Sequence, residues 1–312
     1  MCLTLLWGKT MGLHSRYMSC LTGWMVFFIL LSVQAVASTD DTAASQGSIT
    51  ARLQYQPDGF SHWLPINEER EVVFKKEPSF SGGDVRRGAI PVGGDESDFI
   101  GYACDVEANT LYLDLNQNLD LTDDPTGLCK GAAETYGQFM FADIQMDFEV
   151  KVTRVHAGVT VPYMLHIQLG DFYNGVSVVS GWDGTSVIDG QNYYFVVVDN
   201  LNGHLDGGDT MVLEAIDAKT TVEQMRETWP DYSPGLNYLS ANGRCYGLTW
   251  AFSGTDGGGV LDVNLTEKTD GLGQLNISGQ FVEGVLLSGA QTVKVEKPAA
   301  SVWLPMGEYE LT

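Results

Sequence analysis

Oxygen-bearing side chains recur at every second position of segment 111–125, and this spacing is the strongest chemical signal in the sequence. The alternating positions are occupied by Asp114, Asn116, Asn118, Asp120 and Thr122. Calcium is a hard cation that takes about six to eight oxygen ligands, and a chain curling around it presents alternate side chains. The pattern therefore predicts a calcium site. The alternative is a β-turn rich in Asp and Asn, since these residues favour turns through hydrogen bonds to their own backbone.

The same segment resembles the EF-hand and dockerin-type calcium loop, D-x-[DN]-x-[DN]-G-x-[LIV]-[ST]. The matching positions are Asp114, Asn116, Asn118, Leu121 and Thr122. This resemblance implies that the first three polar residues are direct side-chain ligands. It also implies that Asp120 offers its backbone carbonyl and that Thr122 binds the ion directly or through water.

Two positions of the loop depart from that family pattern. Leu119 replaces the glycine of the sharp turn, and Pro125 replaces the closing bidentate Glu. Asp123 or Asp124 would then have to supply the closing carboxylate. We expect weak binding, with a dissociation constant of roughly 10⁻⁴ to 10⁻³ M, the range of extracellular calcium modules.

A second acidic loop, residues 199–209, also follows an apolar run. Alignment of Gly203 with the turn glycine of the family puts Val198 in the first ligand position, so this copy is one residue out of register. The second set of candidate metal ligands is Asp199, Asn200, Asn202, Asp206 and Asp209. An Asp- and Asn-rich turn is again the alternative.

Other residue types give weaker chemical signals. His156 and His166 would face each other across a predicted hairpin, but no third zinc ligand accompanies them. The sequence has no G-x-S-x-G elbow, HExxH helix or phosphate-binding glycine loop, so no catalytic or organic cofactor-binding residue is predicted. The tryptophans and tyrosines either stack on sugar rings or fill a β-sandwich core, and we favour the core.

The elements that position both loops are predicted to be antiparallel strands. Polar and apolar residues alternate without interruption over 146–153, and 161–169 repeats the pattern after Gly158, which favours a hairpin. Residues 193–198 are apolar on both faces, which is typical of a central strand. Further strands are predicted at 236–240, 245–252, 260–265, 273–278, 280–287 and 292–295.

The predicted fold class is mainly β, with antiparallel β-sandwich-like modules, acidic loops between strands and one short helix at 221–229. The predicted organisation is a signal peptide at 1–37, a flexible lead-in at 38–50, a β-rich region with both loops at 51–220, a helix and linker at 221–235, and a sandwich-like module at 236–312. Residues 303–311 resemble the LPxGxY strand entry of transthyretin-like and carboxypeptidase-regulatory-like modules. Because the chain stops inside this predicted strand, we expect a truncation after Thr312.

The first 37 residues have the order of an export signal. Lys9 and Arg16 precede the apolar run 21–33, and an A-x-A cleavage site ends at Ala37. The run is shorter than the roughly 20 residues that a membrane-spanning helix needs. We therefore expect a secreted, periplasmic or cell-envelope protein with no membrane span after cleavage.

Export also bears on the cysteines that bracket the first loop. Cys104 and Cys129 would form a disulfide closing this loop, or they are free buried thiols, and their spacing does not decide between the two.

The charge balance narrows the class of partner. The chain has 40 acidic and 17 basic residues and a net charge of −23, which repels the phosphates of nucleic acid. The expected function is calcium-dependent structural or adhesive binding, with a glycan or another extracellular protein as partner. The alternative function is a polysaccharide-acting enzyme or its carbohydrate-binding accessory module.

Overall fold

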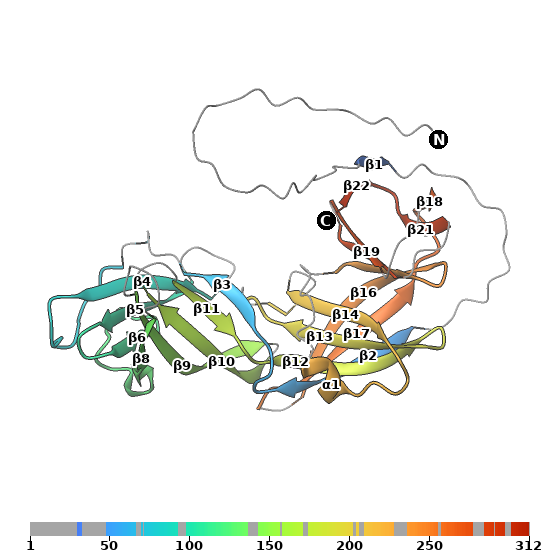
Figure 1. Cartoon of the computed structure of the whole chain (residues 1–312). Helices are drawn as coiled ribbons and strands as arrows, with labels where there is room; N and C mark the ends of the chain where they lie inside the picture. Colours follow the sequence, from blue (N-terminus) through green and yellow to red (C-terminus); the bar gives the residue numbers. More distant parts are fainter. Residues whose placement is uncertain are drawn as a thin grey trace, which may run out of the picture. The chain divides into compact units, whose positions relative to one another are not determined.

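The computed structural model confirms the mainly β class (Figure 1). It describes residues 30–32, 48–66, 70, 72–92, 98–136, 143–156, 158–170, 174–201, 204–205, 209–227, 236–254, 257–276, 284–289, 291–296 and 301–311. Within these ranges, no helix combines the length and the apolar character needed to cross a bilayer.

The chain forms two compact units, which differ from the predicted organisation. The larger unit contains residues 43–237 and 246–267, and the smaller unit contains 1–42, 238–245 and 268–312. Residues 246–267 of the predicted C-terminal module belong to the larger unit. The reason is a long-range strand pairing, because β17 (Val260–Glu267) pairs with β2 (Ile49–Gln56).

Two antiparallel sheets form one part of the larger unit. The first is ordered β4-β5-β6-β7, with β4 (Val85–Pro91), β5 (Phe99–Asp105), β6 (Thr110–Leu113) and β7 (Leu128–Lys130). The second is ordered β3-β11-β10-β9-β8, with β3 (His62–Pro65), β11 (Asn174–Val178), β10 (Val159–Leu169), β9 (Asp143–His156) and β8 (Ala132–Tyr136). The Cys104 and Met146 sulfurs, both buried, lie 3.7 Å apart between β5 and β9.

The predicted hairpin between 146–153 and 161–169 is confirmed as β9 and β10. Gly158, in its turn, has a φ of +83°, which a glycine adopts without steric cost. Every second side chain of β10 is buried, including Tyr163, Leu165, Ile167 and Leu169. Period-2 patterning therefore identified the buried face of this strand correctly.

The other part of the larger unit is an antiparallel arrangement ordered β16-β17-β2-β12-β13-β14. Its further members are β16 (Arg244–Ser253), of which residues 246–253 belong to this unit, β12 (Gly181–Ile188), β13 (Gln191–Val198) and β14 (Thr210–Ile216). Residues 193–198 of β13 are all buried between two neighbouring strands, as predicted. Trp182 is fully buried and packs edge-on against Tyr55, Tyr163 and Phe252, so this tryptophan fills the core.

Helix α1 (Val222–Glu227) begins with a capping box. The Gln224 N–H donates to Thr221 Oγ1 over 3.3 Å, and the Thr221 N–H donates back to Gln224 Oε1 over 2.9 Å. Arg226 at the other end of the helix forms a two-point contact with the buried carboxylate of Asp183 on β12. These contacts fix a helix that is too short to be stable alone.

The smaller unit contains β1 (Leu30–Ser32), β15 (Tyr238–Ala241), β18 (Leu272–Asn276), β19 (Gly284–Gly289), β20 (Val293–Glu296), β21 (Ser301–Pro305) and β22 (Glu308–Leu311). Positive φ angles at Asn242 (+50°) and Gly243 (+78°) fit the predicted Asn-Gly turn after β15. The predicted strand at 303–311 is instead two strands separated by a bend at Met306. Strand β1 lies within the predicted signal peptide, whose other residues are outside the described ranges.

Candidate functional site

The first acidic loop begins with a buried carboxylate directly after β6. Asp114 is 1% exposed, and its N–H donates to the carbonyl of Gly101 on β5. Its two carboxylate oxygens accept the backbone N–H groups of Asn118 over 3.0 Å and Leu119 over 2.9 Å. The sheet therefore fixes the start of the loop, and the Asp114 carboxylate organises the turn that follows.

Leu119 takes the backbone conformation that the missing glycine would have provided. Its φ is +68°, in the left-handed region that costs a side-chain-bearing residue roughly 1–2 kcal/mol. The Leu119 carbonyl accepts the N–H of Lys75 over 2.8 Å, and Lys76 pairs with Asp120 in an isolated parallel bridge. Segment 75–76 thus supports the turn from outside, so the loop keeps its sharp curvature without glycine.

Two carboxylates at the end of the loop fold back over its start. Asp123 accepts the side-chain amide of Asn116 over 3.2 Å and that of Asn118 over 2.7 Å. Asp124 accepts the N–H of Leu115 over 3.1 Å. Burial raises the pKa of Asp124, and the charges of Asp123 and Asp114 add to this effect. Negative charge therefore accumulates where the closing Glu is missing.

The Asp120 carboxylate contacts Thr122 within the loop and Lys76 outside it. It accepts Thr122 Oγ1 over 2.6 Å and the Thr122 N–H over 2.8 Å, and it lies 3.4 Å from Lys76 Nζ. The Thr122 hydroxyl, followed by its N–H, lowers the pKa of this carboxyl group. These contacts occupy the Asp120 carboxylate, and the ligand role of its backbone carbonyl stays a prediction.

The side chains that could bind a metal in this loop include amides as well as carboxylates. In the described part of the chain, no three or more His, Cys, Asp or Glu side chains gather closely enough to hold a metal. The fitting donors are hard oxygens from Asp, Asn, Thr and the backbone, a chemistry that suits calcium and does not suit zinc. A short 3₁₀ helix, η1 (Pro125–Gly127), follows the loop and leads into β7.

The second loop repeats one hydrogen bond of the first in a different register from the predicted one. In the first loop the Leu115 N–H donates to Asp124, and in the second the Asn200 N–H donates to Asp209 over 3.1 Å, each across nine residues. By this hydrogen bond Asp199 corresponds to Asp114, and Gly203 then falls one position before the turn glycine of the family pattern. Like Asp114, Asp199 is buried immediately after a strand.

This correspondence leaves the second loop without amides at the alternate positions. Leu201 and Gly203 stand where the first loop has Asn116 and Asn118. Asp199 accepts the hydroxyl of Tyr163 and the Leu201 N–H, each over 2.6 Å, and so ties the loop to β10. Asn202 and Asp206 lie outside the described residues, and metal binding by this loop stays a prediction.

Of the two alternatives for Cys104 and Cys129, the structure has the free thiols, and it separates His156 from His166. Cys104 and Cys129 are free thiols that flank Leu111 on either side of β6. Two strand spacings separate them by roughly 9–10 Å, beyond the reach of a disulfide. His156 pairs with Val159 whereas His166 pairs with Glu149, so the two histidines lie roughly 23 Å apart along the hairpin.

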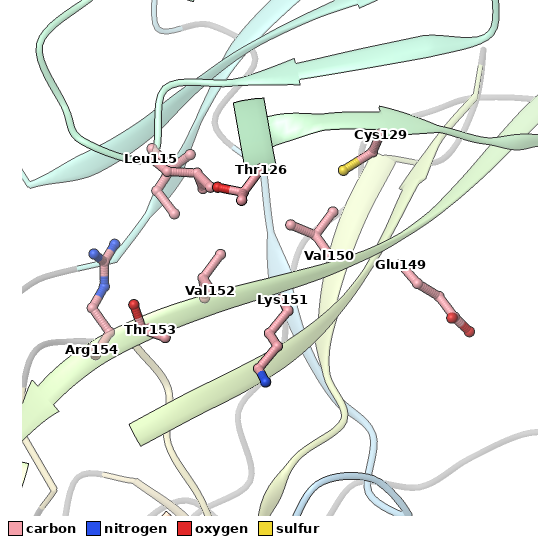
Figure 2. A pocket seen from close by; sticks show the side chains of 10 residues that line it. Leu115, Thr126, Cys129, Glu149, Val150, Lys151, Val152, Thr153 and Arg154 are labelled. Atoms are coloured by element: carbon pink, nitrogen blue, oxygen red, sulfur yellow. The ribbon is translucent and has the colours of Figure 1, made fainter. Parts of the chain in front are cut away.

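Two arginines with unusual surroundings were not among the residues predicted from the sequence. Arg226 binds buried Asp183, and Arg154 lines a pocket beside the first loop (Figure 2). Arg154 carried a detectable signal, because it continues the core-facing period of Met146 to Val152. The Arg226 contact had none, since it joins residues 43 positions apart.

No protein-family model matches this chain, and no curated protein or solved structure matches it either.

Proposed function

We propose that this protein binds calcium outside the cytoplasm through the 114–124 loop and that the ion fixes the loop for a structural or adhesive role. The observation that carries the proposal is the convergence of oxygen donors around one turn. Asp114 anchors the turn, the amides of Asn116 and Asn118 follow at alternate positions, and Asp123 folds back onto both amides. Calcium would replace the two amide N–H groups as the partner of Asp123, once the amides turn their oxygens inward.

The local electrostatics support a cation in this loop. The pKa of Asp124 is raised by burial and by Asp123 and Asp114, so ionised carboxylates lie together at a cost. A divalent cation offsets that repulsion. The loop also connects two paired strands, β6 and β7, which hold both of its ends. Calcium would therefore order only the residues between them.

The decisive experiment is calcium titration by calorimetry together with thermal unfolding. With a dissociation constant of about 10⁻³ M, 10 mM calcium stabilises the folded state by about 1.4 kcal/mol, which raises the melting midpoint by about 3–6 °C. Magnesium, which demands tighter octahedral geometry, should give a smaller shift.

The matched variants are Asp123→Asn and Asp217→Asn. Both carboxylates are exposed, so neither substitution should disturb the core, but only Asp123 belongs to the loop. D123N is expected to weaken calcium binding at least about tenfold. Even the loss of a residue that only hydrogen-bonds to a metal ligand typically weakens metal affinity by about that factor. D217N should bind like the unmodified protein. An unchanged melt in calcium, or equal binding by D123N and the unmodified protein, would refute the proposal.

A further inference from the structure

Strand β9 is longer than the strand that covers one of its edges. β8 pairs with residues 143–147 of β9, whereas β10 pairs with residues 146–156 along the opposite edge. Before β8 the chain turns away from β9 at Gly131, and Lys130 pairs with β6 instead. Within the described part of the chain, residues 148–156 therefore have a neighbouring strand on one edge only.

Three residues of β9 direct their backbone N–H and C=O groups to this free edge. Backbone groups alternate between the two edges along a strand. The Met164 carbonyl of β10 accepts the Val179 N–H on the β11 side, so the odd-numbered residues of β10 bond to the even-numbered residues of β9. Glu149, Lys151 and Thr153 consequently point their backbone groups away from β10. No backbone group among the described residues pairs with them there.

A pocket of about 410 Å³ lies along this edge. Its lining includes every residue from Glu149 to Arg154, although consecutive side chains of a strand point to opposite faces. One pocket that touches both faces must follow the edge between them, and β10 fills the other edge. Leu115, Thr126 and Cys129 line the side across from β9 (Figure 2). The volume lies within the range of roughly 300–1,000 Å³ that is usual for ligand sites, so the free edge has room for a ligand.

The two faces of β9 give this edge an apolar side and a charged side. Leu115, Val150 and Val152 line the pocket, and both valines are buried. Glu149 and Lys151 lie on the other face of β9, and both are exposed. A strand added here would therefore turn apolar side chains inward and place its outward side chains beside these two charges. Opposite charges on neighbouring strands stabilise their pairing, and like charges destabilise it.

We propose that residues 149–153 of β9 bind an extended peptide segment of another protein, which adds a strand antiparallel to β9. An extended backbone is the ligand that matches N–H and C=O groups at alternate positions. Antiparallel pairing continues the pattern of this sheet. The segment would carry an acidic residue opposite Lys151, a basic residue opposite Glu149 and apolar residues beside the two valines. The proposal goes beyond calcium binding and does not depend on it, because no carboxylate of the 114–124 loop lines the pocket.

Pairing of two β9 edges from two copies of the chain fits the pocket less well. Each copy carries Leu115, Thr126 and Cys129 along the same edge, so two approaching edges would bring both of these walls together. A pairing centred on Lys151 would also place the two Lys151 side chains opposite each other, which is destabilising. A single segment with one acidic residue meets neither obstacle.

The probe is the acetylated and amidated pentapeptide Thr-Val-Glu-Val-Lys, whose residues would lie opposite Thr153 to Glu149 in that order. We expect a dissociation constant of about 1 mM or tighter in NMR titrations of the isotope-labelled full chain. The amide hydrogens of Glu149, Lys151 and Thr153 should exchange rapidly in the free protein and slowly with the peptide, whereas those of Val150 and Val152 should be protected throughout. No binding at about 10 mM, or protection of the three edge amides in the free protein, would overturn the proposal.

Two N-methylated peptides separate backbone pairing from side-chain contacts. Methylation of the glutamate nitrogen removes the N–H that would donate to the Lys151 carbonyl, so this peptide should bind at least about tenfold more weakly. Methylation of the nitrogen of the following valine removes an N–H that would point away from β9. That peptide should bind within about threefold of the parent peptide. Equal binding by the two methylated peptides would refute the addition of a strand.

A charge reversal on β9 tests the register of the peptide. The peptide Thr-Val-Lys-Val-Lys should bind the unmodified protein at least about threefold more weakly than the glutamate peptide, and Lys151→Glu should reverse this preference. Lys219→Glu makes the same charge change at an exposed residue outside the pocket and should leave the preference unchanged. An unchanged preference in K151E would refute the proposed register. Edge amides whose protection rises with protein concentration, without peptide, would identify a second copy as the occupant and overturn the proposal.

Discussion

Replacement of Arg226 by Met should destabilise the larger unit more than any surface change on α1. The Asp183 side chain is 1% exposed and that of Arg226 is 27% exposed. Arg226 Nη2 lies 2.7 Å from Asp183 Oδ1, its Nε contacts Oδ2, and the Tyr194 hydroxyl donates to Oδ2 over 3.0 Å. Without Arg226, the buried carboxylate of Asp183 would keep, of these contacts, only the hydrogen bond from the Tyr194 hydroxyl. Breaking a buried ion pair in this way costs about 3–5 kcal/mol.

This loss is large enough to measure by several methods. In a unit of roughly 200 residues each kcal/mol lowers the melting midpoint by about 2–4 °C, so R226M should melt about 6–20 °C lower. Urea unfolding followed by tryptophan fluorescence gives the free energy directly, and Trp182, beside Asp183, is a buried reporter.

A control and a double variant make the Arg226 prediction refutable. Glu223→Gln changes an exposed residue of the same helix and should cost no more than about 0.5 kcal/mol. Asp183→Asn combined with R226M should regain part of the loss, because the buried charge is then gone. A cost below about 1 kcal/mol for R226M, or a double variant less stable than R226M, would show that the pair does not hold α1 as argued.

Three further predictions concern the loop and the thiols. The pKa of Asp124 is raised in the folded loop. Ionisation of this group therefore lowers the stability of the fold as the pH rises from the ordinary carboxyl pKa through the raised one, and calcium should offset this loss of stability. Calcium affinity should therefore fall as the pH drops into the raised carboxylate range, with protons released on binding; calorimetric heats that do not depend on the buffer near that pH would contradict this. Leu119→Gly should relieve the left-handed backbone and raise the free energy of unfolding by up to about 1 kcal/mol, whereas a loss in urea unfolding would mean that the Leu119 side chain matters more than its backbone. Iodoacetamide should modify Cys129 before Cys104 and Cys245. Burial raises the pKa of all three thiols, but Cys129 is the least buried, and the pKa values of the other two are raised to about 12; mass spectrometry showing equal rates would contradict the burial argument.

Local sequence patterns determined much of the fold because the physics behind them acts over few residues. Alternation along a strand reports which face is buried, so β9 and β10 and their hairpin followed from residues 146–169. The Asn242-Gly243 turn followed from the positive φ angles that these two residues tolerate. In the first loop, the alternating oxygens identified the turn and its leading carboxylate, Asp114.

Only the tertiary structure decided how these elements combine. Alternation predicts which face of a strand is buried but not which strand lies beside it. Local patterns therefore could not predict that β17 pairs with β2 or that β6 separates Cys104 from Cys129. Asp123 closes the first loop and Asp209 sets the register of the second, in each case through a contact between the two ends of the loop. The pocket beside the first loop depends on β9 packing near residues 100–129, which belong to another sheet and its loop. Long-range pairing therefore set the sites, whereas local periodicity set the strands that carry them.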